Sequence, residues 1–141
     1  MILSSPAVCI KDTGTDRGRG VFALKPYSSG DVVEVCPVLV FAKASLELPE
    51  PFDKRVFDWA VLAGAPPASS ALALGYGSMY NHANPANMRY EADAPSRLMR
   101  FIAVRDIDAD QELTINYNGY GGVAEWPEDH WFERMGIKPL P

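Results

Sequence analysis

The sequence predicts a single, mostly β domain of short strands with one or two short helices. Its 141 residues, 48% of them apolar, fall in the size range of one compact domain that can bury a core. Short extended runs separated by Gly, Pro, Asp and Ser make up much of the chain, as expected for small strands. One segment, residues 51–64, instead has apolar residues at helical spacing.

Residues 7–42 predict a series of small strands, because apolar pairs such as Val21–Phe22 and Val32–Val33 alternate with turn residues. Pro37 interrupts the apolar run that ends at Phe41. Proline cannot donate a hydrogen bond to a neighbouring strand, so this run predicts either two strands or an edge strand with a bulge.

Residues 51–64 predict one short amphipathic helix. The helix is expected to end at Gly64, with Pro66 and Pro67 beyond it. The apolar face that its spacing predicts consists of Phe52, Val56, Trp59 or Ala60, and Ala63.

Two further strands are predicted towards the C-terminus. The segment 97–107, RLMRFIAVRDI, fits a strand with one buried face. In the segment 112–117, ELTINY, Leu113 and Ile115 point one way and Thr114 and Asn116 the other. The last residues are rich in aromatic side chains and are compatible with a helical turn around PEDHWFERM, near Pro127.

Composition argues against several functional classes. Thirteen basic against eighteen acidic residues give a net charge of −5, which does not suit direct nucleic-acid binding or an anionic membrane and suits a Lys-rich partner better. With only two cysteines, Cys9 and Cys36, and two histidines, we expect reduced thiols and no structural metal. The first ten residues contain a single charge-free, Pro-broken apolar run in front of Lys11, so they do not resemble a signal peptide. No run approaches the roughly 20 apolar residues of a membrane span. A soluble intracellular protein is expected, with nucleus and cytoplasm equally compatible.

Three motifs carry the functional information: RGRGVFA (17–23), YNHANPAN (80–87) and ELTINY (112–117). Each has a structural alternative when taken alone. Gly18 and Gly20 could form a hairpin turn that needs positive φ. Asn81 and His82 could be loop residues around a satisfied histidine, and Tyr117 could be a half-buried aromatic at a strand end.

In this order, the three motifs resemble the SET-domain protein lysine methyltransferases. In that family a Gly-x-Gly turn, an Asn-His loop and a Glu-Leu-Thr-x-x-Tyr strand build one site. The resemblance covers about residues 7–122, and the layout is most similar to minimal viral SET proteins. The loop departs from the family pattern because Ala83 replaces a Ser and Pro85 comes one residue early, whereas Asn87 keeps the closing Asn position.

The resemblance implies a SET-domain (β-clip-like) fold of several small curved sheets. Its C-terminal segment would thread beneath a loop in a pseudoknot-like arrangement. A single SET domain over residues 1–141 is expected, with the core motifs in 7–122. Residues 123–141 would form an aromatic tail that covers the cofactor and the lysine channel.

The resemblance also implies an S-adenosylmethionine-dependent protein-lysine N-methyltransferase that uses no metal. Trp131 is expected to stack on the adenine, with Trp126 as the second choice and core cover as the alternative for either. Tyr117 is the expected catalytic residue and would align the amine with the methyl group. The residues implied in cofactor binding are Gly18, Arg19, Gly20, Asn81, His82, Tyr117 and Trp131.

Tyr90 and Tyr120 are expected to line the lysine channel, although Tyr90 could equally be a plain strand aromatic. The expected substrate is a Lys/Arg-rich tail such as that of a histone, bound like an added strand. A homodimer is possible by analogy with the smallest family members. Two other readings stay open: a catalytically weak SET-fold binding or dimerisation module, and a β-rich structural domain.

Overall fold

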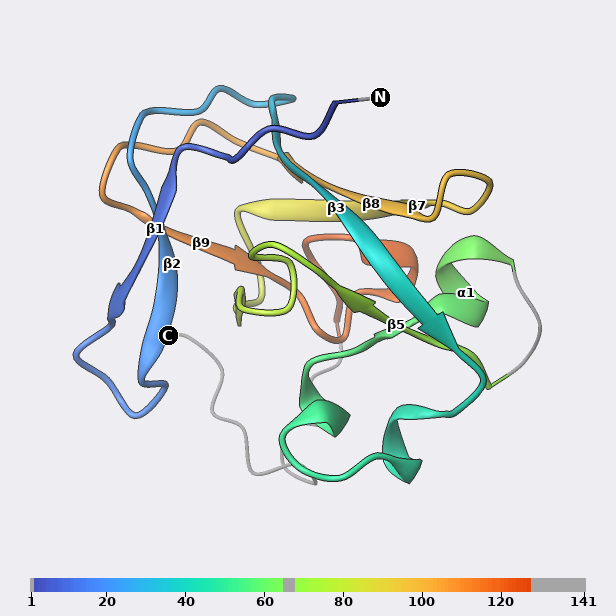
Figure 1. The fold of residues 1–141 in the computed structure, drawn as a ribbon. Coiled ribbons are helices and arrows are strands. Elements are labelled where there is room, and N and C mark those ends of the chain that lie inside the picture. Colours follow the sequence, from blue (N-terminus) through green and yellow to red (C-terminus); the bar gives the residue numbers. More distant parts are fainter. Residues whose placement is uncertain (1, 65–67, 128–141) are drawn as a thin grey trace.

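The computed structural model describes residues 2–64 and 68–127 and consists of two small sheets with little helix (Figure 1). The four-stranded sheet has the order β1-β2-β9-β6, and the five-stranded sheet has the order β4-β5-β3-β8-β7. The strands are β1 Val8–Asp12, β2 Arg19–Ala23, β3 Val32–Phe41, β4 Phe57–Asp58, β5 Ser70–Ala73, β6 Asn81–His82, β7 Met88–Asp93, β8 Leu98–Ala103 and β9 Glu112–Ile115. The helices are α1 Trp59–Ala63 and the 3-10 turns η1 Ser45–Glu47, η2 Phe52–Lys54 and η3 Tyr120–Gly122. The mostly β class is therefore confirmed.

Strand β3 corrects the prediction made around Pro37. It is one continuous strand of ten residues, and it lies in the middle of its sheet. It pairs with β8 up to Pro37 and with β5 from Val38 onward. Pro37 thus stands where the strand changes its pairing partner, and a missing donor costs little there. The irregular register lies instead between Val32 and Glu34.

The predicted helix over residues 51–64 is α-helical only at its C-terminal end, and its start contains only the 3-10 turn η2. Before α1, Phe57 and Asp58 pair with β5, so the chain is extended and cannot continue a helix. The Asp58 side chain then accepts a hydrogen bond from the Val61 backbone N–H and starts α1. Gly64, with φ of 62°, ends the helix in the left-handed conformation, as predicted.

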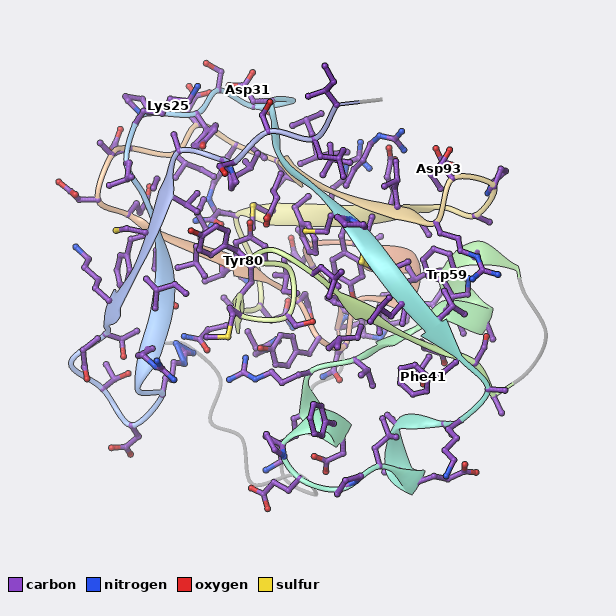
Figure 2. The ribbon with its side chains drawn as sticks, in the orientation of Figure 1. Lys25, Asp31, Phe41, Trp59, Tyr80 and Asp93 are labelled. Atoms are coloured by element: carbon purple, nitrogen blue, oxygen red, sulfur yellow. The ribbon has the colours of Figure 1, made fainter. Side chains whose placement is uncertain are left out.

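The core surrounds strand β8, which is buried on both faces and not on one as expected. Met99 and Phe101 are fully buried on one face of β8, and Leu98 and Ile102 are only 5% and 6% exposed on the other. Edge-on or tilted rings of Phe57, Tyr80 and Tyr90 surround Phe101 at centroid distances of 6.0, 4.9 and 6.0 Å. Figure 2 shows Tyr80 inside the molecule, whereas charged residues such as Asp93 lie at its periphery.

The C-terminal segment lies against the loop that follows β6, in line with the pseudoknot-like arrangement. Asn84 Nδ2 donates to the Trp126 carbonyl at 2.6 Å, and the Trp126 backbone N–H donates back to Asn84 Oδ1 at 3.2 Å. The Ala86 N–H donates to the carbonyl of Ala124 at 2.9 Å. These contacts hold together two segments that are about 40 residues apart in the sequence. The helical turn expected around PEDHWFERM lies outside the described residues, apart from Pro127.

Gly122 of η3 fixes the packing of this segment on β7. Its φ is +86°, and a Cβ there would overlap the backbone carbonyl of Tyr90. Its neighbour Gly121 also has positive φ, at +68°, but a Cβ there would meet nothing within 4 Å. A comparison of alanine substitutions at the two positions therefore distinguishes the cost of backbone strain from the cost of steric overlap.

We predict that Gly122→Ala lowers the free energy of unfolding by about 3 kcal/mol or more, because overlap with Tyr90 adds to the strain of a positive φ. Gly121→Ala should cost only about 1 kcal/mol, from strain alone. Urea unfolding of the two variants measures the difference. Equal losses would show that the carbonyl of Tyr90 does not restrict this segment.

Candidate active site

Strand β9 brings the three sequence motifs together. It pairs with β2 on one side through Val21–Leu113 and runs parallel to β6 on the other. Asn81 lies opposite Thr114, and His82 opposite Ile115. The Gly-x-Gly turn, the Asn-His loop and the final strand are therefore neighbours in one sheet (Figure 1).

Asn81 joins the Gly-x-Gly turn to β9. Its Nδ2 donates to the carbonyl of Arg19 at 3.0 Å and to Glu112 Oε2 at 2.9 Å. A Cβ at Gly20 would lie 2.5 Å from that Glu112 oxygen and 3.0 Å from Asn81 Nδ2. Gly18 has the positive φ expected of a turn, at +73°, whereas Gly20 is needed because its neighbours approach the backbone closely.

Asn87 binds the loop to β9 through its whole amide. Its Nδ2 donates to the Glu112 carbonyl at 2.8 Å, and its Oδ1 accepts from the Thr114 N–H at 2.9 Å. The Asn87 N–H donates to Thr114 Oγ1 at 3.2 Å. At the position where the family has Ser, the Ala83 N–H donates to the Ile115 carbonyl at 3.0 Å. The departures at Ala83 and Pro85 thus leave the loop attached to β9.

His82 is buried and positions the backbone of Tyr117. Its Nδ1 accepts the backbone N–H of Tyr117 at 3.0 Å, so this nitrogen carries no proton. The two rings lie 5.4 Å apart. The His82 carbonyl accepts a hydrogen bond from Arg17 Nη2 at 3.0 Å.

Arg17 is a site residue that the sequence reasoning missed, although it begins the RGRGVFA motif. Burial lowers the pKa of its guanidinium, and the charge of Glu112 opposes this shift. An arginine nevertheless stays protonated. Its Nη1 is buried and has no hydrogen-bond partner among the residues that the structure describes. A cation with a donor still to satisfy, next to Asn81 and His82, fits a carboxylate group.

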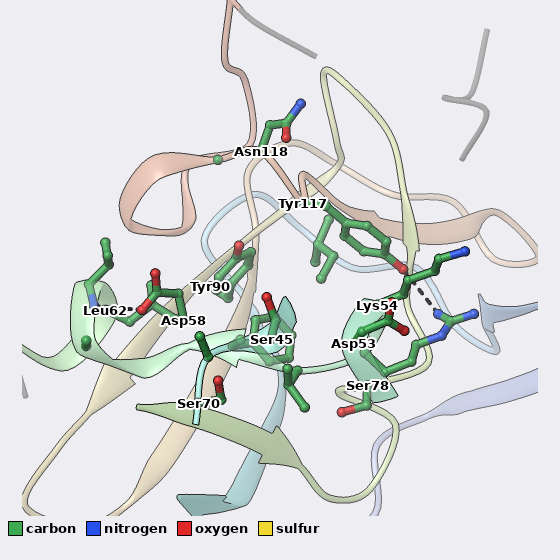
Figure 3. Close-up of a pocket in the computed structure, with 18 of the residues that line it drawn as sticks. Ser45, Asp53, Lys54, Asp58, Leu62, Ser70, Ser78, Tyr90, Tyr117 and Asn118 are labelled. Atoms are coloured by element: carbon green, nitrogen blue, oxygen red, sulfur yellow. Dashed lines mark hydrogen bonds between the residues drawn. The ribbon is translucent and has the colours of Figure 1, made fainter. Parts of the chain in front are cut away.

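The hydroxyl of Tyr117 lies at the centre of a small network. It donates to the backbone carbonyl of Tyr80 at 2.5 Å. It accepts from Arg55 Nη1 at 3.1 Å, the bond drawn as a dashed line at Tyr117 in Figure 3. Burial raises the pKa of Tyr117, whereas the positive charges of Arg55 and Arg17 act in the opposite direction. The net direction is upward, so Tyr117 is a neutral hydroxyl near pH 7.

Tyr80 is held in turn by a buried carboxylate. Its hydroxyl donates to Glu34 Oε1 at 2.6 Å, and Glu34 Oε2 accepts the Tyr76 N–H at 3.0 Å. Burial, then the charge of Glu34, raises the pKa of Tyr80 well above its usual value. A buried carboxylate with both oxygens hydrogen-bonded is a fixed anchor. The Tyr80 residue, whose carbonyl accepts the hydrogen bond of the Tyr117 hydroxyl, is therefore held in place.

A pocket of about 810 Å³ borders the Tyr117 ring. Tyr90 and Tyr120, the two predicted channel residues, both line it together with Tyr117. Figure 3 shows Tyr90 and Tyr117 at the pocket. Tyr90 is buried, and its hydroxyl donates to the Asn116 carbonyl at 3.3 Å, whereas Tyr120 is 66% exposed. Burial raises the pKa of Tyr90 as well. Other walls come from η1, η2, β4 and α1, including Asp53, Arg55 and Asp58.

Of the two tryptophans predicted as candidates for adenine stacking, Trp126 lies within the described residues. The Trp126 ring stacks on Tyr120, with centroids 5.9 Å apart and planes at 28°. Trp131 lies outside the described residues. Adenine stacking by either one stays a prediction.

Residues 2–64 and 68–127 contain no group of three or more His, Cys, Asp or Glu side chains placed to hold a metal ion. None of the helices in the same ranges has the length and apolarity needed to cross a membrane.

Comparison with known proteins identifies the family. The SET-domain model matches residues 18–118, so the chain belongs to the SET-domain family. The chain is 32% identical over 133 residues to a Schizosaccharomyces pombe protein, "Histone-lysine N-methyltransferase, H3 lysine-37 specific", covering 92% of this chain and 83% of the relative.

Solved structures show the same fold. A candidate histone methyltransferase of Plasmodium falciparum superposes with a TM-score of 0.63 at 22% identity, over 82% of this chain and 96% of that one. A chain of an active polycomb repressive complex 2 in the basal state gives a TM-score of 0.64 at 19% identity, over 82% of this chain and 16% of the other. At these identities the likeness concerns the fold alone.

The two glycines of the turn should respond differently to a methyl group. Gly20→Ala would push against Glu112 and Asn81 and should weaken binding of S-adenosylhomocysteine by about tenfold or more, measured by calorimetry. Gly18→Ala adds strain of about 1 kcal/mol but meets no atom within 4 Å, so its effect should fall on stability. An unchanged affinity of Gly20→Ala for S-adenosylhomocysteine would show that the Asn81–Glu112 contact does not contribute to cofactor binding.

Proposed function

We propose that the protein transfers a methyl group from S-adenosylmethionine to a deprotonated lysine in a Lys/Arg-rich protein tail such as that of a histone. The enzyme class, a protein-lysine N-methyltransferase, follows from the family match and from the relative that is 32% identical. The observation that carries the finer proposal is the position of Tyr117. Its backbone is bonded to His82 on the side of the Gly-x-Gly turn, and its ring lines the 810 Å³ pocket.

The residues on the turn side fit the proposed cofactor. S-adenosylmethionine, when bound, supplies a methyl group on a positively charged sulfur. The remaining donor of Arg17 suits the carboxylate of its methionine part. We assign the other contacts to the backbone of Gly18, Arg19 and Gly20 and to Asn81 and His82, as the resemblance implies.

The pocket side fits a neutral lysine amine. A free lysine has a pKa of about 10.4, and lowering it by about 3 units requires about 4 kcal/mol of differential stabilisation. Burial and a nearby positive charge both favour the neutral form. Because the Tyr117 proton points to the Tyr80 carbonyl, the hydroxyl oxygen accepts from the amine and orients its lone pair. Proton loss to water makes a dedicated carboxylate base unnecessary, and alignment is the main task of the site.

The proposed substrate follows from charge and from the relative's name. A net charge of −5 and the carboxylates of Asp53 and Asp58 along the pocket suit a cationic tail. The S. pombe relative is named for lysine 37 of histone H3. A homodimer and an intracellular location stay predictions.

Incubation with labelled S-adenosylmethionine and a panel of Lys-containing peptides tests this function. Wild type should transfer label, and Tyr117→Phe should lose about 100-fold or more in kcat, because the amine is no longer oriented. Tyr27→Phe is a matched control, since it also removes one tyrosine hydroxyl, which donates to the Ala7 carbonyl away from the pocket. Cofactor binding without transfer by wild type would favour the binding module, and full activity of Tyr117→Phe would remove that residue from the mechanism.

Tyr90 should influence how many methyl groups are added. We assign to its hydroxyl, which donates to the Asn116 carbonyl at 3.3 Å, the space that an added methyl group would need, and this favours mono- or dimethylation. Tyr90→Phe should therefore shift the products towards higher methylation states. Mass spectrometry of the peptide products measures the shift, and identical distributions would end this assignment.

A further inference from the structure

Arg55 joins a wall of the pocket to Tyr117. It follows η2, lines the pocket, and donates from Nη1 to the Tyr117 hydroxyl at 3.1 Å (Figure 3). The Tyr117 O–H donates its hydrogen bond to the Tyr80 carbonyl, so Arg55 contacts the same oxygen as a donor. The charge of an arginine is permanent near neutral pH. A fixed cation therefore touches the oxygen on which the proposed reaction depends.

Geometry places this cation close to an incoming amine. A hydroxyl oxygen has the capacity to accept two hydrogen bonds, so an arginine N–H and an amine N–H can both be directed at it. Two nitrogen atoms that bond to one oxygen lie within about 6 Å of each other. At that separation a positive charge disfavours protonation of the neighbouring amine.

We propose that Arg55 is a positioning residue that directs the Tyr117 proton to Tyr80 and keeps the target lysine neutral through its own charge. This inference rests on the proposed methyl transfer. It assigns to Arg55 a part in keeping the target lysine deprotonated. Arg55 need not touch the reacting atoms, because it acts through Tyr117.

Other charges around Tyr117 differ from Arg55 in their position. Arg17 lies on the turn side and donates to the His82 carbonyl, and Glu112 accepts from Asn81. On the pocket walls, Asp58 caps α1, and Lys54 faces Glu50 at 3.9 Å. The ionisable groups that face Tyr117 or line its pocket are Arg17, Asp53, Lys54, Arg55, Asp58, Tyr80, His82, Tyr90, Glu112 and Tyr120.

The pH dependence of kcat tests the proposal in Arg55→Gln, Arg55→Met and Arg55→Lys. Loss of the cation should raise the pKa of the bound lysine and move the acidic limb of the profile upward by about one pH unit. The Gln and Met variants should then have about tenfold lower kcat near pH 7 and recover as the pH rises. Arg55→Lys keeps the charge and should keep the position of the limb.

Arg89→Gln is the matched control, because it removes an exposed arginine that pairs with Glu91 at 3.1 Å on β7. It should have the wild-type profile. An acidic limb that stays in place in both neutral Arg55 variants would overturn the proposal. A neutral variant faster than wild type at every pH would also overturn it, since Arg55 would then obstruct the channel.

A second readout is independent of turnover. In protein with isotope-labelled tyrosine, the NMR signal of the Tyr117 ring carbon that bears the hydroxyl should move in Arg55→Gln and stay in place in Arg89→Gln. An unmoved signal would show that Arg55 does not act on Tyr117. If wild type transfers no methyl group, the proposed function fails, and this signal still decides whether Arg55 and Tyr117 are coupled.

Discussion

The arrangement of the site depends on the side-chain amide of Asn87. This amide replaces ladder hydrogen bonds between the loop after β6 and strand β9: it donates to the Glu112 carbonyl and accepts from the Thr114 N–H. The bond to the Thr114 N–H is buried and the bond to the Glu112 carbonyl is partly buried, and an unsatisfied buried backbone group costs about 1–3 kcal/mol. Because β6 and β9 run parallel, no short turn can join them, and the register of Asn81 and His82 relative to β9 has to come from such a contact.

A second consequence of this attachment is the chain of hydrogen bonds that ends at Tyr117. Glu34 accepts a hydrogen bond from the Tyr80 hydroxyl, and the Tyr80 carbonyl accepts one from the Tyr117 hydroxyl. His82 accepts a third from the Tyr117 backbone N–H. The catalytic hydroxyl is thus fixed from two parts of the chain that are far apart in the sequence, β3 and residues 80–82. Rigid support of this kind keeps a reacting geometry within the small tolerance that alignment requires. It also explains why a buried carboxylate, Glu34, is present in an otherwise apolar strand.

Local pattern predicted strands in the regions of β1 to β3, β8 and β9, the three motifs and the end of α1 at Gly64, because spacing and turn residues act over a few positions. It did not predict β4, β5 or β6. The prediction failed where pairing with a distant strand determines the local conformation. Pro37 lies within one long strand, where the pairing partner changes from β8 to β5. Phe57 pairs with β5, so the chain is extended where a helix was expected. The contributions of Arg17 and Arg55 could not be predicted, since their guanidinium groups reach the backbone carbonyl of His82 and the hydroxyl of Tyr117 across the fold.

The central claim is that Tyr117 separates a cofactor site from a lysine channel. The most direct measurement is a crystal structure with S-adenosylhomocysteine and a lysine peptide. The account predicts the cofactor beside Arg17, Asn81 and His82, and the lysine amine within hydrogen-bond reach of the Tyr117 hydroxyl from the pocket that Tyr90 lines. Cofactor bound in that pocket, or a lysine that approaches without contact to Tyr117, would contradict it.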